Sequence, residues 1–362
     1  MSNKREKVRI CINLPGTIKN GYYSPERGES RWAQNLLCIL GRRDYDVIGC
    51  SVARPEWGDC EILSSVKFCS LTEAKQESHR KMFDILFDSS WFHPGMTEFY
   101  SDFNADVFLH GHWGGCCLEE PGRFPDERHY IVYPNLQVSQ SMLSCAFIHR
   151  NRHLFLPMPL IFRVENWVKK KEKVLTWCIK EAFYKRKEQN LRERALRLWR
   201  VCDELYEKHD VMLHVLQGDQ LVEETSENDL SYVENLRNTR LMSKAVFYGN
   251  YTAYDIVQRI LFNSSVLFRT GEPPGAPMEY EAVAMGCLPL IWKSQQHPFS
   301  KYYDCFGLTL SDELSFGELK ERIEVLMFDE RVRKQLWEMC KVELSLHFDY
   351  KFIEDQLFSV LK

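Results

Sequence analysis

Short apolar runs alternate with longer amphipathic runs in both halves of this chain. Short apolar runs are typical of strands buried on both faces, whereas apolar residues spaced three and four apart indicate helices. In the first half, residues 8–14 and 45–51 are predicted strands, separated by a glycine-bearing loop and a helix from about residue 30. Such strand–loop–helix–strand units build doubly wound parallel sheets. The sequence therefore predicts an α/β fold.

The alternation is interrupted once and then restarts. Residues 164–173 (VENWVKKKEK) are rich in charge, and we interpret them as a linker whose lysines face solvent. Further strands are predicted at residues 106–109, 174–179, 211–217, 245–249, 265–268 and 289–292, and residues 130–159 are strand-like, with prolines and no long helix. Further helices are predicted at 188–208, 253–261, 278–285, 316–344 (with a break near 329) and 350–361.

The length of 362 residues suits two domains of middling size. We predict a first Rossmann-like domain over residues 1–163 and a second over 174–345, joined by the linker. Residues 346–362 are predicted to form a closing helix that crosses back to the first domain.

Composition excludes several classes of protein. The net charge of −4 gives no overall positive field to attract nucleic acid, although a local basic patch remains an alternative. Thirteen scattered cysteines, an odd number, argue against a disulfide scaffold and favour a reducing, cytoplasmic location. The N-terminal apolar run is too short for a signal peptide, and no run approaches the roughly 18 residues of a membrane span. We expect a soluble protein.

Residues 264–292 (SSVLFRTGEPPGAPMEYEAVAMGCLPLIW) have the features of a nucleotide site. A buried strand opens into a loop rich in glycine and proline, which leads into a helix. Backbone N–H groups at such a helix start can hold a diphosphate, so Gly275, Ala276, Pro277 and Met278 at this start are candidate donor-binding residues. Glutamates early in the helix can accept hydrogen bonds from ribose hydroxyls, or can simply favour the helix N-terminus electrostatically. The two glutamates concerned are Glu279 and Glu281.

The stretch from Glu281 to Pro289 (EAVAMGCLP) resembles the donor motif of GT-B glycosyltransferases. It is most similar to the large retaining family related to sucrose and glycogen synthases, in which Glu, seven residues and Glu-Ala-Met-Ala-x-Gly-x-Pro follow one another. The resemblance implies that Glu281 binds the donor ribose and that Glu272 lies near the donor sugar. Eight residues separate these glutamates here, one more than in the family. The GCLPLIW ending is also similar to inverting exostosin-type and fucosyl-type enzymes.

The same resemblance extends to other segments. Gly16 occupies the glycine loop of the acceptor domain, and His112, in DVFLHGHW, corresponds to a histidine facing the transferred sugar. Lys180, with Lys185 or Arg186, corresponds to two cations that hold the diphosphate leaving group. From the residues alone, the glycine fits an ordinary loop, the histidine a structural role and the cations a solvated helix start. The resemblance implies two Rossmann-like domains facing a cleft.

We therefore expect a retaining transfer of sugar from a nucleotide sugar to a hydroxyl acceptor on a glycan, lipid or protein. No obligatory metal is expected, because cations and helix-end amides can stabilise the leaving diphosphate. The triplet Asp44-Tyr45-Asp46 is predicted to be a turn and not a metal site. Three alternatives remain open: a nucleotide-sugar epimerase, a glucosyltransferase acting on DNA bases through aromatic stacking, and a non-catalytic ligand-binding protein.

Overall fold

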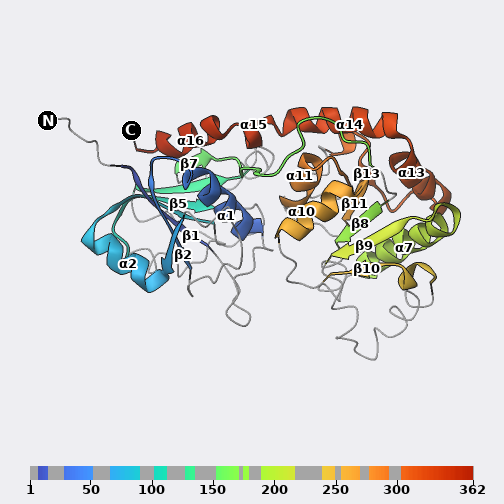
Figure 1. Ribbon diagram of the computed structural model, residues 1–362, viewed down its shortest axis with the longest axis horizontal. Helices are drawn as coiled ribbons and strands as arrows, with labels where there is room; N and C mark the ends of the chain where they lie inside the picture. The colour runs from blue at the N-terminus through green and yellow to red at the C-terminus, as the bar shows by residue number, and fades with distance from the viewer. Residues whose placement is uncertain are drawn as a thin grey trace, which may run out of the picture. The chain divides into compact units, whose positions relative to one another are not determined.

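A computed structural model describes most of the chain, which divides into two compact units (Figure 1). Unit 1 comprises Met1–Ile161 together with Ser345–Lys362, and unit 2 comprises Phe162–Leu344. The described residues are 7–14, 28–51, 66–89, 102–111, 127–134, 152–170, 174–178, 189–216, 239–248, 254–269, 277–292 and 303–361.

Unit 1 is built on a seven-stranded sheet in which every neighbouring pair is parallel. Its order is β3-β2-β1-β4-β5-β6-β7, so the chain first adds strands on one side of β1 and then on the other. The strands are β1 (Arg9–Asn13), β2 (Asp46–Ser51), β3 (Lys67–Ser70), β4 (Phe83–Asp88), β5 (Ala105–Gly111), β6 (His129–Tyr133) and β7 (Arg152–Phe155). Helices α1 (Gly28–Leu40) and α2 (Leu71–Arg80) connect the first four of them.

Unit 2 repeats this plan with a six-stranded parallel sheet ordered β10-β9-β8-β11-β12-β13. Its strands are β8 (Val174–Cys178), β9 (Met212–Leu216), β10 (Val246–Phe247), β11 (Val266–Arg269), β12 (Leu288–Trp292) and β13 (Thr309–Leu310). The main helices are α7 (Gln189–His209), α10 (Tyr254–Asn263), α11 (Pro277–Ala284), α13 (Phe316–Phe328) and α14 (Glu330–Glu343). The predicted doubly wound α/β fold is therefore confirmed.

The predicted elements of the second half lie within a few residues of the observed ones. The break near residue 329 is also observed, because Asp329 ends α13 and its side chain caps the first turn of α14. The sequence analysis missed β3, α2, β4 and β13. Helix α2 escaped notice because it buries only Ala74 and Ser78 and so shows little apolar periodicity, although its capping box between Ser70 and Glu73 is readable.

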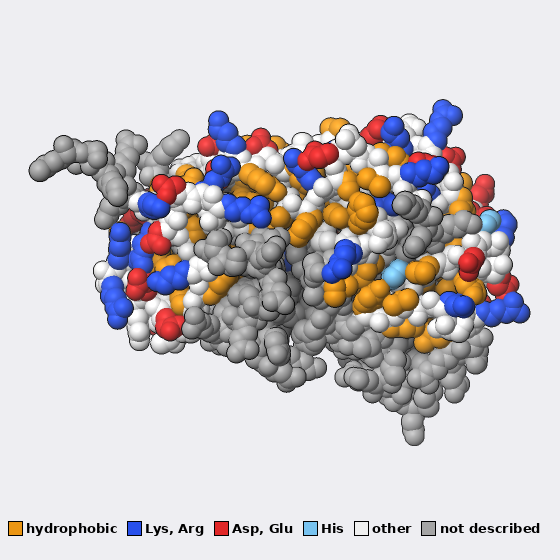
Figure 2. Space-filling model, in the orientation of Figure 1, with side chains coloured by type: hydrophobic (Ala, Val, Ile, Leu, Met, Phe, Trp, Pro, Cys, Tyr) orange, Lys and Arg blue, Asp and Glu red, His pale blue; other side chains and the backbone are white. Residues whose placement is uncertain are grey.

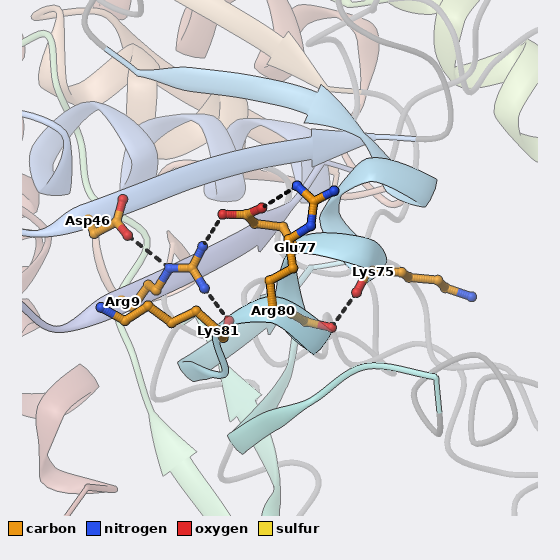
Figure 3. Close-up of polar contacts among 7 residues, drawn as sticks. Arg9, Asp46, Lys75, Glu77, Arg80 and Lys81 are labelled. Atoms are coloured by element: carbon orange, nitrogen blue, oxygen red, sulfur yellow. Dashed lines mark hydrogen bonds and ion pairs between the residues drawn. The ribbon is translucent and has the colours of Figure 1, made fainter.

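A buried arginine, Arg9, connects β1 to β2, α2 and β4 at the amino-terminal edge of the first sheet (Figure 3). The Arg9 guanidinium donates to Asp46 at the start of β2 (2.9 Å), to Glu77 of α2 (2.8 Å) and to the carbonyl oxygen of Lys81. The backbone N–H of Arg9 also donates to Asp84 in β4 (2.6 Å). A buried charge is tolerated when it is paired and hydrogen-bonded in this way. The network stabilises the edge opposite to the one at which parallel sheets bind ligands.

The C-terminal segment packs on unit 1, as predicted. Helices α15 (Ser345–Phe348) and α16 (Tyr350–Ser359) are joined to the stretch after β7 by three hydrogen bonds. Nδ1 of His347 donates to the carbonyl of Met158 (2.8 Å), and the N–H of Leu160 donates to the carbonyl of His347 (3.0 Å). The hydroxyl of Tyr350 donates to the carbonyl of Leu160 (2.8 Å). The chain thus passes between the units twice.

Acid should weaken this attachment. Burial lowers the pKa of His347 from 6.5 to about 4, so the unfolded chain takes up its proton first as the pH falls. Stability is then lost between pH 6.5 and 4, by at most about 1.4 kcal/mol per pH unit. In His347→Asn, an amide N–H replaces Nδ1 and cannot titrate. Urea unfolding across this pH range should show a shallower loss of stability in the variant; identical slopes would contradict the assignment.

Candidate functional site

The candidate site lies at the carboxyl-terminal edge of the second sheet. The chain winds outward from β8 toward β10 and then from β11 toward β13, which makes the boundary between β8 and β11 the switch point. Loops that leave the two central strands of such a sheet diverge there and form a crevice in which ligands bind. Cys178 and Arg269, the last residues of β8 and β11, are paired in register. Both strands therefore deliver their following segments to the same place.

Most of the predicted donor residues belong to these two following segments. Lys180, Lys185 and Arg186 follow β8, whereas Glu272, Gly275 and Ala276 follow β11. All six lie outside the described residues, as do Gly16 and His112, which follow β1 and β5 in unit 1. Their roles stay predictions, and the sheet topology shows only that their segments begin at the carboxyl-terminal edges.

Helix α11 begins at Pro277, which suits a first helical position because proline lacks an N–H group. The helix is buried along its length, with Glu281 only 1% exposed. Met278 and Ala282 pack into the hydrophobic core beside α10 and β11. Met278 is thus a core residue, and any contact of Met278 with a diphosphate would be made by its backbone. Burying a glutamate in so apolar a helix indicates a role beyond solubility.

Glu279 forms an ion pair that the sequence analysis missed. Its Oε1 atom lies 3.0 Å from Nε of Arg269, and both side chains are at most 10% exposed. The pair joins the end of β11 to the first turn of α11, and so fixes where the helix begins relative to the strand. The sequence did contain a signal for this pair: Arg269 ends a buried strand, and Glu279 follows ten residues later at the start of a helix.

Unit 1 has a second polar row at its own carboxyl-terminal edge. Asn13, Asp88 and His110 are paired in register across β1, β4 and β5, and Nδ2 of Asn13 donates to Asp88 (3.1 Å). Gly111 follows His110, and a Cβ there would lie 2.8 Å from the Cα of Ser89. The absence of a side chain allows β5 to approach the end of β4. The sequence analysis did not identify Asp88, because β4 itself was missed.

The surroundings of His110 disfavour its charged form. Its Nε2 atom lies 2.9 Å from Nδ1 of His129 on β6, and the two rings are nearly parallel. Burial, and then the neighbouring His129, lower the pKa of His110 well below its usual value. A neutral His110 that is hydrogen-bonded to His129 within the sheet is a structural feature. The predicted contact with the transferred sugar concerns the other histidine of the HGH sequence, His112, which lies outside the described residues.

Among the described residues, no cluster of three or more His, Cys, Asp and Glu side chains is arranged to hold a metal ion. No helix within them is long and apolar enough to cross a bilayer. On the face shown in Figure 2, the described lysine and arginine side chains are interspersed with aspartate and glutamate side chains. Asp44 lies in the predicted turn, whereas Asp46 is already the first residue of β2.

Comparisons with known proteins identify the fold. No protein-family model matches the sequence, and no curated protein sequence matches it significantly. Solved structures do match over almost the full length. The Anabaena protein HepE in complex with UDP-glucose aligns with a TM-score of 0.65 at 10% identity, covering 98% of this chain and 99% of that one. Sucrose-phosphate synthase from Thermosynechococcus elongatus gives 0.63 at 12% identity, with 97% and 98% covered.

A glycosyltransferase from Rickettsia africae aligns with a TM-score of 0.60 at 14% identity, covering 98% of both chains. These neighbours share the GT-B architecture of two Rossmann-like units. The order of strands in both sheets and the return of the C-terminal helix to unit 1 agree with it. The chain therefore has the GT-B fold.

The ion pair at the start of α11 should matter for stability. In Glu279→Gln the guanidinium of Arg269 stays buried without its counter-charge, which should cost about 3 kcal/mol in the free energy of unfolding. Glu338→Gln is the matched control, because Glu338 also pairs with a cation in a helix (Lys334, 3.8 Å) but is 57% exposed. It should cost less than about 1 kcal/mol. Equal losses in urea unfolding of the two variants would show that the buried pair is dispensable.

Proposed function

We propose that this chain is a glycosyltransferase that binds a nucleotide sugar at the switch point of unit 2 and transfers the sugar to a hydroxyl acceptor. The observation that carries the proposal is the position of α11. This buried helix follows β11, one of the two strands that border the switch point, and it carries Glu281 within a sequence that resembles the GT-B donor motif. HepE, which shares the fold, was solved with UDP and with UDP-glucose.

The chemistry follows from these parts. The bond between the anomeric carbon and the diphosphate breaks, the acceptor oxygen bonds to that carbon, and the proton of the acceptor hydroxyl passes to the departing diphosphate. Charge that develops on the departing diphosphate is stabilised by the N–H groups of the first turn of α11, helped by Lys180 and by Lys185 or Arg186. Glu281 holds the ribose, and no obligatory metal is needed for these steps.

In this proposal Glu272 lies near the donor sugar, and His112 contacts the transferred sugar. A glycan, lipid or protein hydroxyl fits the acidic balance of the chain better than DNA does. We further propose a retaining outcome, on the resemblance of the segment from Glu272 to Glu281 to the retaining family. NMR of the product formed from an α-linked donor should show an α-linked sugar, and a β-linked product would assign the chain to an inverting class.

The donor site can be tested with UDP, ADP and GDP and with their glucose conjugates in a thermal-unfolding panel. A ligand present at 100 times its Kd stabilises the native state by about 2.7 kcal/mol, which is readily detected. Glu281→Gln should weaken binding of the best ligand by about 10- to 100-fold, since a hydrogen bond to a charged group contributes about 1.5–3 kcal/mol.

Glu338→Gln serves again as the control and should bind like the wild type. Sugar transfer should also persist in EDTA. If no nucleotide stabilises the wild type, the proposed function is wrong; if Glu281→Gln retains full affinity, Glu281 does not hold the ribose.

A further inference from the structure

The C-terminal end of α11 is unusually well bonded. The last carbonyl groups of a helix have no partner within the helix and need donors from elsewhere. Three of them are satisfied locally: the N–H of Met285 donates to Glu281 (3.0 Å), that of Cys287 to Ala282 (2.8 Å) and that of Gly286 to Val283 (3.0 Å). Gly286 has a φ of 75°, as expected of the glycine that ends a helix in this Schellman arrangement.

Three more donors reach the same end from distant parts of unit 2. Nε1 of Trp337 donates to the carbonyl of Val283 (2.7 Å), and the N–H of Val164 donates to the carbonyl of Ala284 (2.8 Å). Nζ of Lys170 donates to the carbonyl of Met285 (3.0 Å). Consecutive carbonyl groups of the final turn are therefore held by side chains and backbone that are remote in sequence.

These donors come from the two stretches by which the chain passes between the units. Residues 162–170, the first connecting stretch, lead from unit 1 into unit 2, and α14, the second, ends just before the chain returns to unit 1. The rings of Trp167 and Trp337 lie 5.6 Å apart, and Lys341 donates to the carbonyl of Glu165. The two connecting stretches are thus joined to each other and to α11 (Figure 1).

Lys170 contacts the C-terminal ends of two helices, α11 and α10. It also donates to the carbonyl of Phe262 in the last turn of α10, and its ammonium lies 5.0 Å from the ring centre of Phe262. One cation therefore serves the negative ends of two helices, where a positive charge is favourable. Burial lowers the pKa of Lys170 to about 8. The prediction that this lysine run faces solvent is wrong for Lys170, although it holds for Lys169, whose side chain is 77% exposed.

We propose that Lys170 and Trp337 are positioning residues for the donor site, which they influence by holding the far end of α11. The inference rests on the proposed function. Helix α11 has eight residues, so the whole helix is only about 12 Å long. A displacement at the end held by Lys170 therefore moves Glu281 and the first-turn N–H groups with it. Misplacement by about 1 Å can reduce a rate about 100-fold.

The test compares Lys170→Met, which removes the ammonium but keeps the aliphatic chain, with Lys170→Arg, which keeps the charge and the donors. Lys169→Met is the matched control, since Lys169 is the neighbouring lysine and only pairs with Glu330 at the surface (3.1 Å). Trp337→Phe keeps the ring and removes only the donor to Val283, so it remains informative if Lys170→Met fails to fold. Each variant is measured for its Kd for UDP and UDP-glucose, and for amide hydrogen exchange of residues 277–285 without ligand.

We expect Lys170→Met to bind UDP about tenfold more weakly and to exchange the amide hydrogens of α11 faster. A cation at a partly buried helix end can change an equilibrium constant by about tenfold or more. Lys170→Arg should restore the affinity to within about threefold, and Trp337→Phe should show a smaller loss. Lys169→Met should match the wild type. If the wild type binds UDP and Lys170→Met and Trp337→Phe bind it equally well, the positioning role is wrong and the proposed function stands. If the wild type binds neither ligand nor any other nucleotide of the panel, both fail.

Discussion

The carbonyl groups at the end of α11 impose the constraint on which the structure of unit 2 depends. This eight-residue helix is buried, so its unpaired backbone groups cannot turn to water. They are satisfied by the helix's own glycine turn and by Trp337, Val164 and Lys170. The other end is fixed by the ion pair between Arg269 and Glu279. Because both of its ends are fixed, α11 is held in one position relative to β11.

Stabilising contacts and candidate chemistry are separated along the strands of each sheet. In unit 1 the Arg9 network lies at the amino-terminal edge, whereas Asn13 and Asp88 lie at the carboxyl-terminal edge. Parallel strands make this separation possible, because all of their carboxyl ends meet at one edge. The hydrogen-bonded pair of His110 and His129 belongs to the stabilising group despite its place near that edge.

The sequence was sufficient to predict the features that follow from local patterns. Apolar runs predicted the strands of unit 2 other than β13, and a glycine after a small-residue helix predicted the end of α11 at Gly286. Contacts between distant residues left no such trace. Lys170 looks like its neighbour Lys169 in the sequence, and only the fold brings it to two helix ends 92 and 115 residues away. Arg269 and Glu279 were missed as a pair because their geometry depends on the strand and helix that they join.

The most direct measurement of the central claim is amide hydrogen exchange of the wild-type chain with and without UDP-glucose. If α11 and the ends of β8 and β11 form the donor site, the ligand should slow exchange in peptides that cover residues 174–178, 266–269 and 277–285. Peptides covering the opposite edge of the same sheet, at residues 210–213, should be unaffected. Protection confined to that opposite edge, or to unit 1, would contradict a donor site at the switch point of unit 2.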